Sequence, residues 1–142
     1  MLKVFAVLVA VSVLSLFAFP VGAQDKHEGK LLFHVVSIKF KQGTSEEQIK
    51  AVEEAFAGLK EKIPGIVAMT WGTNVSPEKH DKGFTHCFIL GFDGDKSRDT
   101  YLTHPEHKAF GKVLGPVMED VFVIDFWGDV KHEQPGRADA DK

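Results

Sequence analysis

The most constraining feature of this sequence is a pair of segments, residues 31–40 and 84–92, in which apolar side chains occur on both alternating faces. A period of two in segments rich in Val, Ile and Phe predicts β-strands. The more apolar faces carry Leu32, His34, Val36, Ile38 and Phe40 in the first segment, and Phe84, His86, Phe88, Leu90 and Phe92 in the second. The opposite faces carry Phe33, Val35, Cys87 and Ile89. A sheet built from such strands must be covered on both faces.

Two further segments have the period of amphipathic helices. Thr44 and Glu47 form the pattern of a capping box, and the helix they start is expected to end at Pro64. Its apolar positions recur at intervals of three and four residues: Ile49, Val52, Phe56, Leu59 and Ile63. A second helical segment covers residues 97–102, is interrupted at His104-Pro105, and continues over residues 105–114.

With strands also predicted at residues 66–75 and 121–127, the order of elements is βαββαβ. Right-handed connections then give an α+β, ferredoxin-like fold: a four-stranded antiparallel sheet, the first and third strands central, and both helices on one face. We assign the more apolar strand faces to the helix side. The last strand adds either Val121 and Val123 or Phe122 and Ile124 to the opposite face. A second copy of the chain is the simplest cover for that face, so we expect a homodimer, a dimeric α+β barrel.

The N-terminus differs in character from the rest of the chain. Residues 1–23 combine Lys3, an apolar run and small residues before a potential cleavage point, which is the pattern of a secretory signal peptide. We expect an exported protein, periplasmic or secreted, with no stable membrane insertion after the signal is removed. Residues 24–30 are expected to be a linker, 31–127 the folded domain, and 128–142 a flexible polar tail. The remaining 119 residues carry a formal charge of −4, which argues against nucleic acid as a partner.

Several polar rings fall on the predicted helix side of the sheet. His34 and His86 lie on the inner faces of the two central strands, and His107 shares a helical face with Phe110. With Tyr101, these histidines predict a small-molecule pocket whose apolar wall is Val36, Ile38, Phe56, Phe88 and Phe110. The alternative is that each histidine is a hydrogen-bonded core residue.

Histidine and tyrosine are suited to acid–base chemistry on a carbonyl compound near neutral pH. Metal binding is the competing chemistry, through His104 and His107 or through His34, His86 and His107. The sequence has no established metal-binding, nucleotide-binding or serine-hydrolase motif, so we expect neither metal nor cofactor. Cys87, the only cysteine, is expected to be a small packing residue.

The motifs HVVSIKFK, IPGIVAMTWG, GFTHCFILGF and YLTHPEHKAFG, with Asp125-Phe126 after them, span residues 34–126. In this combination the chain resembles the stress-responsive A/B barrel domain family of the dimeric α+β barrel superfamily. The resemblance implies a ferredoxin-like homodimer.

One member of that family is a plant cyclase that closes a linear polyketide by aldol condensation. By resemblance to it, His107 is the catalytic base, Tyr101 its partner, and His34 and His86 are pocket residues, whereas Phe56 stands in place of a pocket tyrosine. This leads to three alternatives. The first is an exported cyclase- or lyase-like enzyme or binder acting on a carbonyl or polyketide-like compound. The second is a non-catalytic stress-related scaffold, and the third is a monooxygenase, cofactor-free or haem-linked.

Overall fold

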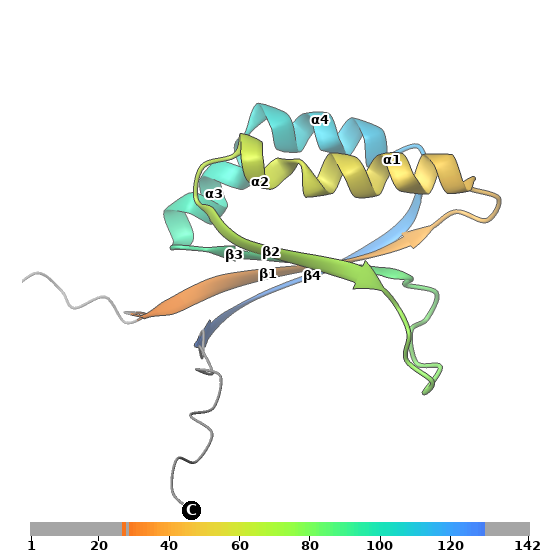
Figure 1. Cartoon of the computed structure of the whole chain (residues 1–142), viewed down its shortest axis with the longest axis horizontal. Coiled ribbons are helices and arrows are strands. Elements are labelled where there is room, and N and C mark those ends of the chain that lie inside the picture. The colour runs from red at the N-terminus through yellow and green to blue at the C-terminus, as the bar shows by residue number, and fades with distance from the viewer. Residues whose placement is uncertain (1–26, 28, 130–142) are drawn as a thin grey trace, which may run out of the picture.

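The computed structural model describes residue 27 and residues 29–129, which form one four-stranded sheet with helices on one face (Figure 1). The predicted signal peptide and most of the linker and tail lie outside these residues. Along the chain the elements are β1 (Lys30–Phe40), α1 (Glu46–Ala57), α2 (Leu59–Lys62), β2 (Ile66–Thr73), β3 (His86–Phe92), α3 (Asp95–Thr103), α4 (Pro105–Leu114) and β4 (Met118–Asp129). The strand order is β2-β3-β1-β4, all pairs antiparallel, which confirms the predicted ferredoxin-like class.

The helix side of the sheet forms the hydrophobic core. Alternate residues of β1 and β3 are buried there, as their sequence period predicts. The core centres on Phe56 of α1, whose ring stacks on Phe88 of β3 with centroids 4.0 Å apart. On β1 the buried side chains of this face are Leu32, His34, Val36 and Ile38, and on β3 they are His86, Phe88, Leu90 and Phe92.

The first helix differs from the prediction at its start and near its end. Its N-cap is Ser45 rather than Thr44, and the capping box joins Ser45 to Gln48. The Gln48 amide donates to Ser45 Oγ at 3.3 Å, and Gln48 Oε1 accepts from the Ser45 amide at 3.0 Å. The Thr44 hydroxyl instead donates to the carbonyl of Lys41. The single expected helix is also divided at Gly58, a residue that weakens helices because it lacks a side chain.

The start of the third strand is a second correction. Phe84 was expected on the helix side, but it lies before β3, in the loop of residues 74–85. The Phe84 amide donates to the Asp81 carbonyl in a turn, so strand alternation does not extend back to it. Its ring instead contacts Phe122, with centroids 6.4 Å apart.

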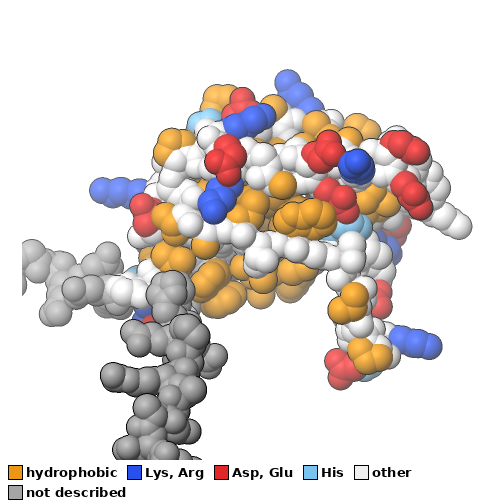
Figure 2. Space-filling view, in the orientation of Figure 1, with side chains coloured by type: hydrophobic (Ala, Val, Ile, Leu, Met, Phe, Trp, Pro, Cys, Tyr) orange, Lys and Arg blue, Asp and Glu red, His pale blue; other side chains and the backbone are white. Residues whose placement is uncertain are grey.

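The face of the sheet opposite the helices is called the open face here. Figure 2 shows hydrophobic side chains gathered along it, below the charged helix layer. Phe122 and Ile124 belong to this face because they pair in register with Ser37 and Val35. β4 exposes five large apolar residues, each between 38% and 52%. Phe122, Ile124 and Phe126 lie on the open face, whereas Val121 and Val123 lie on the helix side, opposite Ile38 and Val36. In the described part of the chain, no helix is long and apolar enough to cross a membrane.

Candidate functional site

A cavity of about 270 Å³ lies between the helices and the sheet, and we call it the helix-side cavity. Elements β1, α1, α3, α4 and β4 all contribute to its wall. The polar rings that line it are His34, Tyr101 and His107. The rest of the lining is apolar apart from backbone: Val36, Phe56, Leu102, Phe110, Gly111, Leu114, Val121 and Val123.

The break between α3 and α4 places Tyr101 beside His107. His104 ends α3 in an extended conformation, and its Nδ1 accepts a hydrogen bond from the Glu106 amide, capping α4. The change of direction places the Tyr101 and His107 ring centroids 4.3 Å apart. His107 Nδ1 lies 3.3 Å from the Leu102 carbonyl oxygen, which can only accept. Nδ1 therefore carries the proton, and Nε2 is the nitrogen left to act as a base.

A charged network behind the cavity holds His34. His34 Nδ1 lies 2.6 Å from Asp125 Oδ1, across the β1–β4 pairing. The other oxygen of Asp125 accepts from Arg98, which also bonds to Asp99. The His34 ring is 5.5 Å from that of Tyr101, centroid to centroid. By this arrangement Asp125 fixes the orientation of His34 within an apolar wall.

Burial sets the protonation of the other two rings in opposite senses. Burial raises the pKa of Tyr101, and the negative charge of Asp125 adds to the effect. The Tyr101 hydroxyl thus keeps its proton and can donate a hydrogen bond. Burial lowers the pKa of His107, and the neighbouring His34 lowers it further, against the opposing effect of the Leu102 hydrogen bond. His107 is therefore neutral at pH 7 and able to take up a proton.

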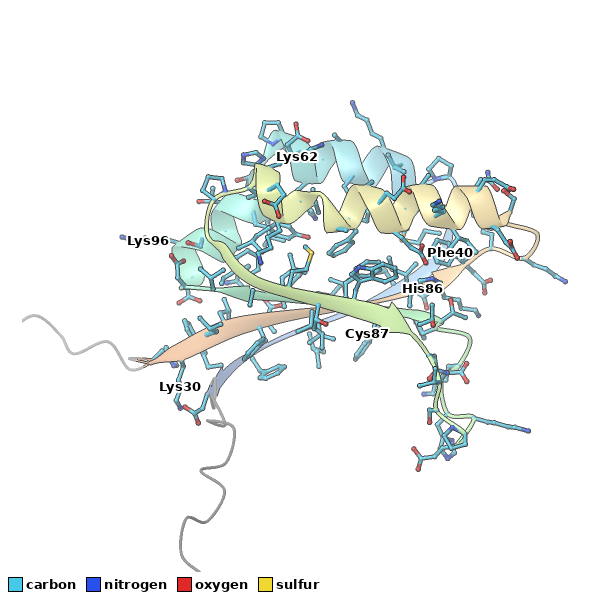
Figure 3. The ribbon with its side chains drawn as sticks, in the orientation of Figure 1. Lys30, Phe40, Lys62, His86, Cys87 and Lys96 are labelled. Carbon is cyan, nitrogen blue, oxygen red and sulfur yellow. The ribbon has the colours of Figure 1, made fainter. Side chains whose placement is uncertain are left out.

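The structure brings together six of the nine predicted site residues: His34, Val36, Phe56, Tyr101, His107 and Phe110. Ile38 and Phe88 are fully buried in the core and do not line the helix-side cavity. His86 lies beside Phe40, toward the end of the core away from His34 (Figure 3). The reason is the β1–β3 register, which pairs His86 with Ile38, four residues along β1 from His34. Four strand residues span roughly 13 Å.

His86 has hydrogen-bond partners of its own. Its Nε2 lies 3.0 Å from Glu53 Oε1, and its Nδ1 lies 2.9 Å from Thr85 Oγ1. The three-histidine metal site that the sequence left open is therefore not assembled. Among the described residues, no group of three or more His, Cys, Asp or Glu side chains is placed to hold a metal ion.

The sequence did not predict two features of the site. One is Arg98, and the other is the hydrogen bond between Asp125 and His34. A carboxylate within the otherwise apolar residues 121–127 is the signal that could have indicated Asp125. Its meaning depends on the strand register, which places it opposite His34.

Comparison with known proteins decides the family. Residues 32–128 match the model of the family described as "Stress responsive A/B Barrel Domain". The chain belongs to this A/B barrel family.

Two plant proteins are similar to this A/B barrel chain. Stress-response A/B barrel domain-containing protein HS1 from Arabidopsis thaliana is 33% identical over 93 residues, which is 66% of this chain and 85% of the relative. Olivetolic acid cyclase from Cannabis sativa is 27% identical over 93 residues, covering 66% of this chain and 92% of the cyclase.

The fold of this A/B barrel chain also occurs in solved structures. A dimeric ferredoxin-like protein of unknown function from Thermobifida fusca matches it with a TM-score of 0.61 and 18% identity. The match covers 72% of this chain and 95% of that protein. Dimeric proteins are thus among the structural neighbours of this chain.

Proposed function

We propose that the helix-side cavity binds a small, largely apolar compound with a carbonyl group, and that the protein is a cyclase- or lyase-like acid–base enzyme acting on it. The observation that carries this proposal is the convergence of His107, Tyr101 and His34 on one otherwise apolar cavity. Such a combination of apolar wall and few polar groups is typical of small-molecule sites.

The geometry supports one type of step. His107 Nε2 takes the proton from the carbon next to the carbonyl, and the electrons of that C–H bond move onto the carbonyl oxygen. The Tyr101 hydroxyl donates a hydrogen bond to that oxygen and stabilises the enolate. His34, oriented by Asp125, presents its Nε2 as a second polar contact. The enolate carbon can then attack a second carbonyl carbon, whose C=O π electrons move onto its oxygen, and that oxygen takes up the proton held by His107.

The family supports the same reading. One A/B barrel relative is an olivetolic acid cyclase, and this chain matches 92% of its length. The cavity volume of about 270 Å³ lies near the lower end of the range for ligand sites, which favours a small compound. Phe56 contributes an apolar ring to the wall, so the compound is recognised mainly by shape and by the three polar rings.

Native mass spectrometry of protein purified from its own source tests this proposal. We expect a small bound compound in the wild type. Gly111 lines the helix-side cavity one helical turn after His107, and a Cβ added there meets nothing within 4 Å, so we expect the side chain of Gly111→Leu to occupy part of the cavity. This variant should lose the compound while its helix is stabilised by about 0.5–1 kcal/mol, since glycine is removed.

Lys112→Leu, on an exposed position of the same helix, is the matched control and should retain the compound. Equal retention by both variants, or wild-type protein without any compound, would instead favour a non-catalytic scaffold whose histidines are packing residues. We also propose that residues 1–23 direct export of the protein and are then removed. The mass of the chain in the same spectrum tests this, because a chain without these residues is expected.

We also propose that the open face is buried in a homodimer. Phe122 and Ile124 of β4 and the ring pair Phe33–Phe126, 5.3 Å between centroids, lie on the open face, and Phe122, Ile124 and Phe126 are each about half exposed within the described chain. Structural neighbours that are dimeric support this assignment. Size-exclusion chromatography with light scattering should give the mass of two chains.

Phe126→Lys should shift the protein to monomer, because it places a charge in the buried face. Val113→Lys adds the same charge at a comparably exposed position on α4 and should leave the dimer intact. A wild-type monomer at micromolar concentration would contradict the proposal.

A further inference from the structure

The helix α3 carries Tyr101 of the proposed acid–base site, yet little of α3 is buried. It has nine residues, and Tyr101 is the one whose side chain is buried. Gly94 precedes the helix and forms no side-chain capping bond, so the first turn lacks the stabilisation that Ser45 gives to α1. The position of Tyr101 therefore depends on what else joins α3 to the sheet.

Arg98 makes such a contact. It lies three residues before Tyr101, on the same side of α3. Its guanidinium group bonds to Asp125 of β4, and within the described part of the chain no other ion pair joins α3 to a strand. Arg98 also has acidic neighbours on its own helix, with Nε 2.8 Å from Asp99 Oδ1 and Nη2 3.7 Å from Asp95 Oδ1. Arg98 thus connects its helix to the sheet rather than lying along the helix surface.

Asp125 extends this contact to His34. Its Oδ2 accepts from Arg98, and its Oδ1 lies 2.6 Å from His34 Nδ1, so one carboxylate joins α3, β4 and β1. These side chains are largely buried, with 23% of Arg98, 26% of Asp125 and 7% of His34 exposed. Water competes less for a partly buried charged contact than for one on the surface, which makes the contact stronger. The same contacts therefore set the separation of the His34 and Tyr101 rings, which is 5.5 Å between centroids.

We propose that Arg98 is a positioning residue of the acid–base site. Its ion pair with Asp125 holds α3 on β4, and so keeps the Tyr101 hydroxyl in the same cavity as His34 and His107. Arg98 does not itself line the helix-side cavity, so it acts through Asp125 and not by contact with a ligand. The catalytic part of this role rests on the proposed function, whereas the geometric part does not.

NMR of the purified protein tests the geometric part without any ligand. In the wild type, the His34 and Tyr101 rings should give a nuclear Overhauser effect (NOE), because they contact edge to face. Arg98→Met retains much of the aliphatic stem but removes the ion pair, so the NOE should be lost. Arg98→Lys retains the charge and should keep the NOE, since an ammonium group can still pair with Asp125.

Two matched variants separate the contact with the sheet from the other charges of α3. Lys96→Met removes an exposed charge from a side chain that extends outward from the molecule, and should keep the NOE (Figure 3). Asp99→Asn removes a partner of Arg98 on the helix itself, and should keep it too. An NOE that persists in Arg98→Met, or that is lost equally in Arg98→Lys or in either control, would overturn the proposal.

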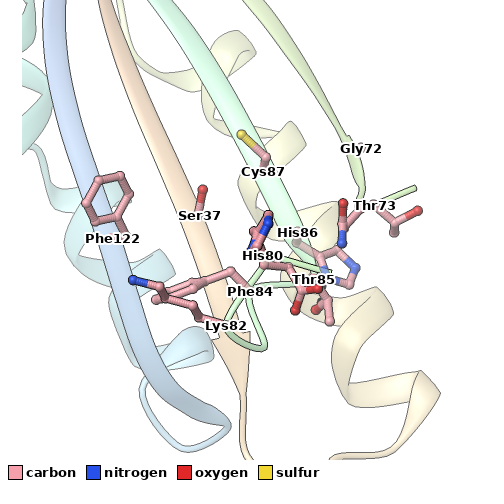
Figure 4. A pocket seen from close by; sticks show the side chains of 12 residues that line it. Ser37, Gly72, Thr73, His80, Lys82, Phe84, Thr85, His86, Cys87 and Phe122 are labelled. Atoms are coloured by element: carbon pink, nitrogen blue, oxygen red, sulfur yellow. Dashed lines mark hydrogen bonds between the residues drawn. The ribbon is translucent and has the colours of Figure 1, made fainter. Parts of the chain in front are cut away.

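The oligomeric state checks that the variants fold. Arg98 lies on the helix side of the sheet, whereas a cavity of about 440 Å³ on the open face is lined by residues that include Ser37, Gly72, Cys87 and Phe122 (Figure 4). The proposed homodimer covers that open face, so variants of Arg98 should elute in size-exclusion chromatography as the wild type does. Arg98→Gln, which is also uncharged, takes the place of Arg98→Met if the latter elutes differently.

Kinetics with the compound identified in the helix-side cavity tests the catalytic part. Arg98→Met should lower kcat by about 10- to 100-fold, because a displacement of about 1 Å in a catalytic group has effects of this size. Its KM should change less than about twofold, because the apolar wall that binds the compound is unchanged. Lys96→Met should keep both values.

The two measurements distinguish failure of this proposal from failure of the proposed function. A lost NOE with an unchanged kcat would remove Arg98 from the mechanism. Absence of any bound compound would contradict the proposed function, and the NOE would still decide whether Arg98 sets the position of Tyr101.

Discussion

Replacing His107 by glutamine should lower kcat/KM for the compound retained in the helix-side cavity by about 100- to 10,000-fold. Glutamine preserves much of the side-chain volume but cannot take up a proton. Tyr101→Phe should have a smaller effect, about 10- to 1,000-fold, because it removes one hydrogen bond to the developing negative charge and leaves the base in place. Steady-state kinetics with the compound identified by native mass spectrometry measures both effects.

The pH dependence gives an independent test of the same role. Because burial lowers the pKa of His107, the acid limb of kcat/KM should have its midpoint below 6.5, the ordinary value for histidine. Activity is full where His107 is neutral and falls as the pH drops through its lowered pKa. The raised pKa of Tyr101 means that ionisation of this hydroxyl causes no loss of activity up to pH 10.

Lys108→Gln, at an exposed position next to His107, is the control for changes in α4 and should keep full activity. Unchanged kcat/KM in His107→Gln, with the fold intact, would remove His107 from the proposed mechanism. A large loss of thermal stability in that variant would assign it a packing role instead.

The order of elements and the two faces of the sheet could be predicted from the sequence because both depend on local periodicity. Alternation in residues 31–40 correctly placed Val36 and Ile38 on the helix side, and the His104-Pro105 break was correctly placed between two helices. The sequence pattern could not decide which of two neighbouring residues caps the first helix. Thr44 and Ser45 both suit an N-cap, and only the observed hydrogen bonds identify Ser45.

The membership of the site could be predicted only in part, for a geometric reason. Facing the helices is a property of a residue's own strand, whereas lining one cavity depends on the register between strands. His34 and His86 share the helix side but are displaced along it, so one lines the helix-side cavity and the other pairs with Glu53. The pairing of His34 with Asp125 likewise follows from the β1–β4 register. A period within one segment contains no information about that register.

Replacing Phe88 by alanine should lower the free energy of unfolding by about 3–5 kcal/mol, the largest effect we expect on stability. The ring is fully buried and lies between two others, Phe56 at 4.0 Å and Trp71 at 5.3 Å between centroids. Alanine therefore loses both the buried area and two stacked ring contacts, and it leaves a cavity that a close-packed core fills only in part.

Urea unfolding at equal protein concentrations measures this loss and keeps any contribution from association the same. Phe88→Leu, which retains more of the volume, should cost less than Phe88→Ala, and Val75→Ala, at a side chain 90% exposed, should change stability by less than about 0.5 kcal/mol. A loss below about 1 kcal/mol in Phe88→Ala would mean that the layer between α1 and the sheet can repack.

Because Phe88 does not line the helix-side cavity, Phe88→Ala should lose stability without a change in the acid limb of the pH profile of kcat/KM. Together with His107→Gln, this variant separates the residues that hold the helices on the sheet from those that act in the space between them.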